Sequence, residues 1–248
     1  DAGDYISDPH SIHASWTSSD NESGISKFEY AVGTTAGGVD VLNWTNAGTN
    51  TQATITGLNL VNGGRYYVSV RATNGAMLTG VPGSSDGVVL DTTTPVVPTV
   101  TDEGEYTAST KQLRATWSSS DSESGIARYR YSIGTSAGAT DVVLWTDIGS
   151  NTSVTHTGLV LTHGQRYYLN VIAINGAGAQ SEVGSSDGIR VDATAPTRPV
   201  VNDDGMYTAS ATELHATWDA SDPDSGVVRF EYSIGTSAGG TNIVDWTD

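Results

Sequence analysis

The residues best suited to chemistry in this sequence are paired carboxylates in short turns that contain glycine. The pairs are Asp20-x-Glu22 before Gly24, Asp121-x-Glu123 before Gly125, and Asp222-x-Asp224 before Gly226. Two oxygen-bearing side chains at alternate positions of one loop suit Ca²⁺, and the glycine permits the turn. Ordinary solvated turns have the same composition, and the motif is much shorter than an EF-hand loop. Calcium is therefore one open interpretation, and no cofactor is required.

One class of tryptophan could bind a carbohydrate. Its members share one sequence context and are followed by threonine: Trp44, Trp145 and Trp246. On an exposed edge strand such a ring could stack on a sugar. Packing in the fold is the favoured interpretation, because large aromatic side chains usually bury most of their area.

Other catalytic and metal chemistry finds no support in the residues. The chain has no Cys, and its five His residues lack the spacing of a zinc site. Serine is plentiful, as in Ser84-Ser-Asp-Gly87, but no Gly-x-Ser-x-Gly nucleophile turn precedes a helix. The carboxylate pairs recur at a fixed period, which active sites rarely do, so we expect no enzymatic activity.

An internal repeat explains the positions of these residues. Trp16, Trp117 and Trp218 are equally spaced, since 117 − 16 and 218 − 117 both give 101. This period indicates consecutive similar domains, because solenoid repeats span about 20–50 residues. We predict a first repeat at 1–92 without its first edge strand, a complete second repeat at 93–193, and the first half of a third at 194–248. Proline-containing linkers join them.

Each repeat is predicted to consist of short antiparallel strands. Leu113, Ala115 and Trp117 alternate with polar residues, which places them on one face of a half-buried strand. No segment shows a sustained helical period. Several short strands separated by turns predict an all-β fold, with one antiparallel β-sandwich for each repeat.

These features resemble tandem fibronectin type III domains, an Ig-like sandwich family, of bacterial or archaeal surface and secreted proteins. The marks are a Trp on the second strand, a Tyr on the third and a Tyr-x-Val-x-Val-x-Ala-x-Asn strand, here Tyr66 to Asn74. The resemblance covers nearly the whole chain but implies no particular function. The aromatic residues expected to form the cores are Trp16, Tyr30, Tyr66, Trp117, Tyr131, Tyr167, Trp218 and Tyr232.

Charge and hydropathy exclude some partners. The chain of 248 residues has 28 Asp and Glu against 11 Lys and Arg, a net charge of −17. This balance argues against nucleic acid and anionic membranes, because no basic stripe exists to bind phosphates. No run of about 18 apolar residues is present, so we expect no membrane insertion in this segment.

The expected function is that of a non-catalytic extracellular spacer in a large surface, filament or adhesin protein. Two alternatives stay open: a carbohydrate-binding accessory module of a secreted polysaccharide-active enzyme, and a calcium-stiffened adhesive array. The expected partners are further copies of the repeat in a longer chain. Self-association, neighbouring surface proteins and a glycan are also compatible with the sequence.

Overall fold

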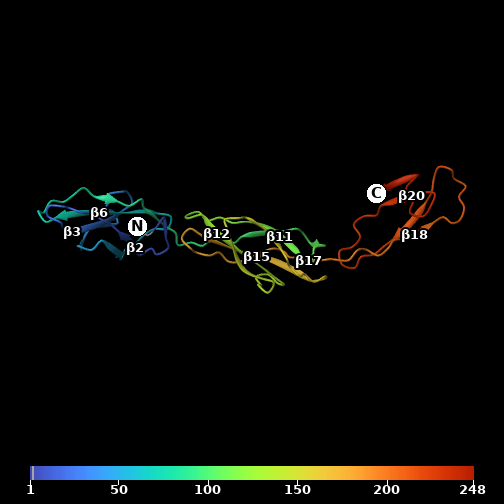
Figure 1. Ribbon diagram of the computed structural model, residues 1–248, viewed down its shortest axis with the longest axis horizontal. Coiled ribbons are helices and arrows are strands. Elements are labelled where there is room, and N and C mark those ends of the chain that lie inside the picture. The colour runs from blue at the N-terminus through green and yellow to red at the C-terminus, as the bar shows by residue number, and fades with distance from the viewer. Residues whose placement is uncertain (2) are drawn as a thin grey trace. The chain divides into compact units, whose positions relative to one another are not determined.

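The computed structural model describes residue 1 and residues 3–248, and every regular element in that part of the chain is a β-strand (Figure 1). The predicted all-β class is confirmed. The chain forms two compact units. The first contains residues 1–102, 114–154 and 168–188, and the second contains residues 103–113, 155–167 and 189–248.

Strands β1–β8 form the first sandwich. Its larger sheet has the order β1 (Tyr5–Ile6), β8 (Val88–Leu90), β6 (Arg65–Asn74), β3 (Ile25–Gly33) and β4 (Leu42–Gly48), with β7 (Gly83–Ser84) also paired to β6. β1 runs parallel to β8, whereas the other pairs are antiparallel. The smaller sheet pairs β2 (Ser11–Ser15) with β5 (Gln52–Thr56).

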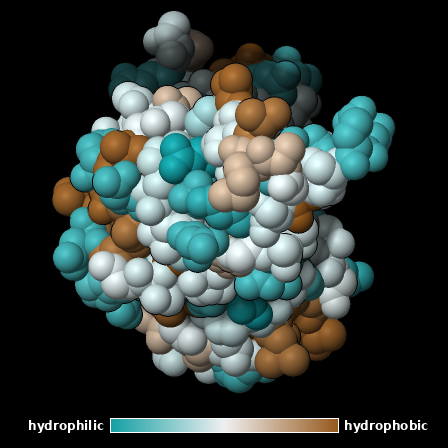
Figure 2. All heavy atoms as spheres, turned by 90° about the vertical axis from the view of Figure 1, so that its left-hand side faces the viewer, coloured by the Kyte–Doolittle hydropathy of each residue, from teal (hydrophilic) through white to brown (hydrophobic). Residues whose placement is uncertain are grey.

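The core of the first sandwich lies between these sheets because alternate strand residues point to the same side. Ile12 and Ile55 come from the smaller sheet, and Val32, Val88 and Leu90 come from the larger one. All five are almost completely buried. Figure 2 shows one end of this sandwich as a mixed surface, with hydrophobic residues scattered among polar ones.

Strands β9–β17 form the second sandwich with the same topology. One sheet has the order β10 (Tyr106–Thr107), β17 (Ile189–Val191), β15 (Arg166–Asn175), β12 (Ile126–Gly134) and β13 (Val143–Gly149), with β16 (Gly184–Ser185) on β15. The other has the order β14 (Ser153–Thr157), β11 (Gln112–Ser118) and β9 (Thr99–Asp102). In the described residues the first sandwich has no counterpart of β9.

The remaining strands form two separate pairs: β18 (Val200–Asp203) with β19 (Ala216–Asp219), and β20 (Tyr232–Ile234) with β21 (Val244–Thr247). Trp218 and Tyr232 stack with ring centroids 5.7 Å apart. Each is 38% exposed in the described chain, so the expectation that both belong to a core stays a prediction. The reason is that no strand equivalent to β6 or β15 pairs with β20 in the described chain.

The other predicted core aromatics differ in how far they are buried. Tyr66, Trp117, Tyr131 and Tyr167 are buried. Trp16 and Tyr30 are only half-buried and pack against the core of the first sandwich. Trp16 and Trp117 occupy equivalent positions, so their difference in burial reflects what covers them.

A tyrosine fixes the turn before the longest strand in both sandwiches. The hydroxyl oxygen of Tyr66 accepts a hydrogen bond of 2.8 Å from the backbone N–H of Val61. The hydroxyl of Tyr167 accepts the equivalent bond of 2.9 Å from Thr162. This contact is the tyrosine corner of fibronectin type III-like sandwiches.

Replacing Tyr167 with phenylalanine tests the importance of this corner. We expect Tyr167→Phe to lower the free energy of unfolding by about 1 kcal/mol, because it removes one hydrogen bond and leaves the ring in place. Urea unfolding followed by tryptophan fluorescence measures the change. Tyr168→Phe is the control, since it removes a hydroxyl from the same strand without affecting this bond. Equal effects of the two variants would contradict the assignment.

Candidate functional site: the acidic joints

The most elaborate polar cluster is built around Asp91, which directly follows β8 and is completely buried. Its carboxylate accepts hydrogen bonds from the Ser124 hydroxyl and, at 2.7 Å, from Nδ2 of Asn175. Thr93 donates to the other carboxylate oxygen, from its backbone N–H at 3.0 Å and its hydroxyl at 2.9 Å. The carboxylate that ends the first sandwich is thus held by residues of the second. All of these residues belong to one compact unit.

Further contacts surround this carboxylate. Glu123 accepts hydrogen bonds from Nδ2 of Asn62 at 3.2 Å and from the Thr93 hydroxyl at 3.1 Å. The ring of Tyr5 approaches Gly176 so closely that a Cβ on this glycine would lie 2.8 Å from it. The absence of a side chain at Gly176 therefore allows the first sandwich to contact the second.

The electrostatics of Asp91 combine two opposed effects. Burial disfavours the charged form, but hydrogen bonds from Ser124 and Thr93 outweigh it and hold the pKa of Asp91 below its ordinary value. Asn175 also donates to Asp121, at 3.2 Å, so its amide group bridges the two carboxylates. The arrangement stabilises a buried charge with protein donors alone.

A second cluster repeats this design around Asp192, which follows β17. Its carboxylate accepts a 2.6 Å bond from the Ser225 hydroxyl and two 3.0 Å bonds from Thr194. The bond from Ser225, followed by that from the Thr194 backbone, lowers the pKa of Asp192. At its edge, Asp224 lies 3.1 Å from Nη2 of Arg190 and 3.3 Å from Nε2 of His163. These residues all belong to the other compact unit.

The structure brings four of the six predicted calcium ligands into these joints. Asp121 and Glu123 join Asp91, with one carboxylate oxygen of each within 4.8 Å of the others. Asp224 forms a similar group with His163 and Asp192, and Asp222 accepts hydrogen bonds of 2.9 Å from the backbone of Asp224 and Ser225. Sequence reasoning did not include Asp91 and Asp192 among the ligands. Their repeated position after a closing strand was the available signal.

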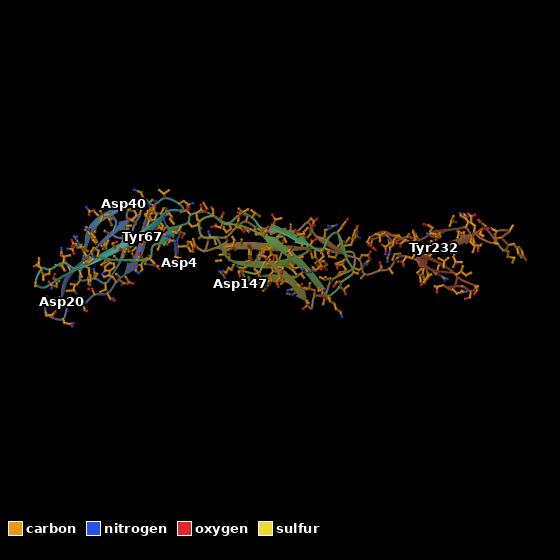
Figure 3. The ribbon with its side chains drawn as sticks, turned by 90° about the horizontal axis from the view of Figure 1, so that it is seen from above. Asp4, Asp20, Asp40, Tyr67, Asp147 and Tyr232 are labelled. Atoms are coloured by element: carbon orange, nitrogen blue, oxygen red, sulfur yellow. The ribbon has the colours of Figure 1, made fainter. Side chains whose placement is uncertain are left out.

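Asp20 and Glu22 form no comparable three-residue group among the described residues. Asp20 instead accepts hydrogen bonds from Nδ2 of Asn74 at 3.0 Å and from the Ser23 backbone at 2.7 Å. These bonds, that of Asn74 first, lower its pKa. Figure 3 shows Asp20 and Asp4 at opposite ends of the first sandwich.

The three tryptophans proposed for carbohydrate binding occupy different environments. Trp44 is half-buried, and the Arg71 guanidinium lies 4.3 Å from the centre of its ring. Arg71 also forms a 3.1 Å ion pair with Glu29, so it is held over this face of the ring. Trp145 is half-buried without an equivalent arginine, because Ile172 occupies that position, and Trp246 is 60% exposed.

Comparisons with known proteins agree on the fold alone. No protein-family model and no curated protein sequence matches the chain. Fibronectin(III)-like modules of Clostridium thermocellum CbhA are 20% identical, with a TM-score of 0.45, over 77% of this chain and 90% of that one. The FN1-FN3 domains of chicken CNTN1 are 17% identical, with a TM-score of 0.42, over 77% of this chain and 66% of that one. Domains A168-A170 of titin are 18% identical, with a TM-score of 0.41, over 77% of this chain and 62% of that one.

The strand order and the tyrosine corners define an all-β protein built from β-sandwiches. The β-sandwich fold class predicted from the sequence is therefore confirmed. The described residues contain no helix that is long and apolar enough to span a membrane.

The buried carboxylate makes the stability of the first joint depend on pH. Because the pKa of folded Asp91 lies below its unfolded value of about 3.9, its stabilising contribution is present above about pH 4 and is lost as the pH falls through the folded pKa. We expect the difference in unfolding free energy between the wild type and Asp91→Asn to shrink between about pH 6 and pH 3.

Urea unfolding at several pH values measures this difference. The matched control is Asp86→Asn, which changes an exposed carboxylate in the loop before the same strand. A difference for Asp91→Asn that stays constant over the pH range would show that the buried group does not stabilise the joint in its charged form.

Proposed function

We propose that the chain is a non-catalytic structural segment, a spacer made of consecutive sandwich modules in a large extracellular surface, filament or adhesin protein. One observation carries the proposal: the carboxylate that ends one sandwich is buried among donors of the next, and the same residue types recur at Asp192. A site that repeats in this way is suited to holding modules together.

The linkers support a stiff spacer. Pro95 and Pro98 restrict the backbone between the first and second sandwiches. The linker is also anchored to the acidic turn of the second sandwich, because the N–H of Val96 donates to the carbonyl of Ser120 at 2.9 Å. The equivalent bond from Thr197 to Ser221 measures 2.8 Å. Such a spacer would set a distance between functional parts of a longer protein, and its natural partners would be further copies of the repeat.

Distance measurements between spin labels test the stiffness of the first joint. The chain lacks Cys, so Thr49→Cys with Ser150→Cys places one label at the same exposed turn of each of the first two sandwiches. We expect a narrow distance distribution that Asp91→Ala broadens, because the variant removes the bonds that Ser124 and Asn175 donate across the joint to Asp91. The distribution is measured by double electron–electron resonance.

Asp86→Ala is the matched control and should leave the distribution narrow. A broad distribution in the otherwise unmodified chain would contradict a stiff joint. A narrow distribution in Asp91→Ala would instead assign the stiffness to the proline linker alone.

Calcium binding is the alternative to this proposal, and one observation favours it: ligand atoms of Asp91, Asp121 and Glu123 lie within 4.8 Å of one another. Against it, protein donors already satisfy the Asp91 carboxylate. We therefore expect thermal unfolding to occur at the same temperature with calcium and with a chelator. A rise in melting temperature with calcium that Glu123→Gln abolishes would establish the calcium-stiffened array instead.

A further inference from the structure

The smaller sheet of each sandwich ends in a regular strand with one free edge. In the first sandwich β5 pairs with β2 from Gln52 to Thr56 without a register shift. In the second sandwich β14 lies at one end of the three-stranded sheet, and β9 lies at the other end. The free edges of β5 and β14 are equivalent, and the edge of β14 stays open although its sheet contains a third strand.

Alternate residues of these strands direct their backbone groups away from the sheet. The N–H of Trp16 donates to the carbonyl of Thr51 at 2.8 Å. Hydrogen-bonded and non-hydrogen-bonded pairs alternate along an antiparallel ladder, so every second residue after Thr51 bonds to β2. The residues between them present their N–H and C=O groups to the free edge: Gln52, Thr54 and Thr56. In the second sandwich the equivalent bond from Trp117 to Thr152 is 2.9 Å long. The outward residues there are Ser153, Thr155 and Thr157.

The edge strand of the larger sheet is different. In β4, Oδ1 of Asn43 accepts a hydrogen bond from the N–H of Trp44, and Oδ1 of Asn46 accepts one from the N–H of Gly48, both at 2.8 Å. The pairing of β3 with β4 also contains register shifts. Side chains that bind their own backbone, and bulges, keep a strand edge from pairing with another chain. In the described residues the outward groups of β5 have neither kind of protection.

Charge does not oppose pairing at these edges. The net charge of −17 favours the separation of copies in general. No Asp, Glu, Lys or Arg lies between Asp40 and Arg65, however, and this stretch contains the whole of β5. The same is true between Asp147 and Arg166, where β14 lies. Two copies can therefore bring these strands together without placing like charges opposite each other.

We propose that the free edges of β5 and β14 are self-association sites, each of which binds the same strand of a second copy of this chain. The two strands run antiparallel about a twofold axis, so that Thr54 lies opposite Thr54 of the other copy, or Thr155 opposite Thr155. Each outward residue then exchanges its backbone bonds with the residue opposite, and threonine pairs in this position are favourable. A twofold interface uses the same surface on both copies. The inference rests on the strand geometry and does not depend on the proposed spacer function.

Amide hydrogen exchange and sedimentation velocity test the proposal on the whole chain. The contact covers one short strand, so we expect weak association that appears as the protein concentration rises. Exchange of the Thr54 and Thr155 amides should become slower over the same concentration range. The Trp44 amide is the internal control, because the Asn43 side chain binds it at every concentration.

Two double variants should disrupt the association. Thr54→Pro with Thr155→Pro removes an outward N–H from each edge and leaves the bonds within the sheet in place. We expect the dissociation constant to rise about tenfold or more, because each pairing loses two hydrogen bonds. Thr54→Lys with Thr155→Lys keeps the backbone intact but places like charges opposite each other, and should have the same effect.

Thr54→Val with Thr155→Val is the matched control, since it keeps both N–H groups and a β-branched side chain. This variant should associate as the wild type does. A wild type that stays monomeric at every concentration would overturn the proposal. So would a lysine double variant that associates as tightly as the wild type.

Discussion

The burial of one carboxylate constrains the whole region around the first linker. An unpaired charge in a protein interior is destabilising by several kcal/mol, so Asp91 can be buried only when its donors are in place. Those donors come from the linker, from a turn and from the end of a long strand, at Thr93, Ser124 and Asn175. The closing strand of one sandwich is therefore energetically coupled to the folding of the next.

The two joints share this buried group but differ at their edges. Around Asp91 the edge is neutral or acidic, with Asn62 donating to Glu123. Around Asp192 the corresponding positions carry His163 and Asp224, and Arg190 replaces Val89 and pairs with Asp224. Exposed ion pairs contribute little to stability and are screened by salt. The two joints thus share the buried carboxylate and its donors, whereas the residues at the edge differ between them.

Sequence reasoning identified the fold because the alternation in strands such as β11 is a local property that the burial of Leu113, Ala115 and Trp117 follows. It identified Asp121 and Glu123 from their spacing in one turn. It could not show which residues bind Asp91, because Asn175 lies 84 residues away and Ser124 lies 33 residues away.

Two equivalent glycines, Gly83 and Gly184, lie in different surroundings, although the larger sheets of the two sandwiches have the same strand order. At Gly184 a strand passes so close that only a hydrogen atom fits, whereas Gly83 faces open space. Glycine in a strand loses more conformational entropy on folding than other residues, and at Gly184 the close approach of another segment requires it. The need for glycine at position 184 therefore follows from the close approach of the Pro98 carbonyl, a contact that packing of the second sandwich creates.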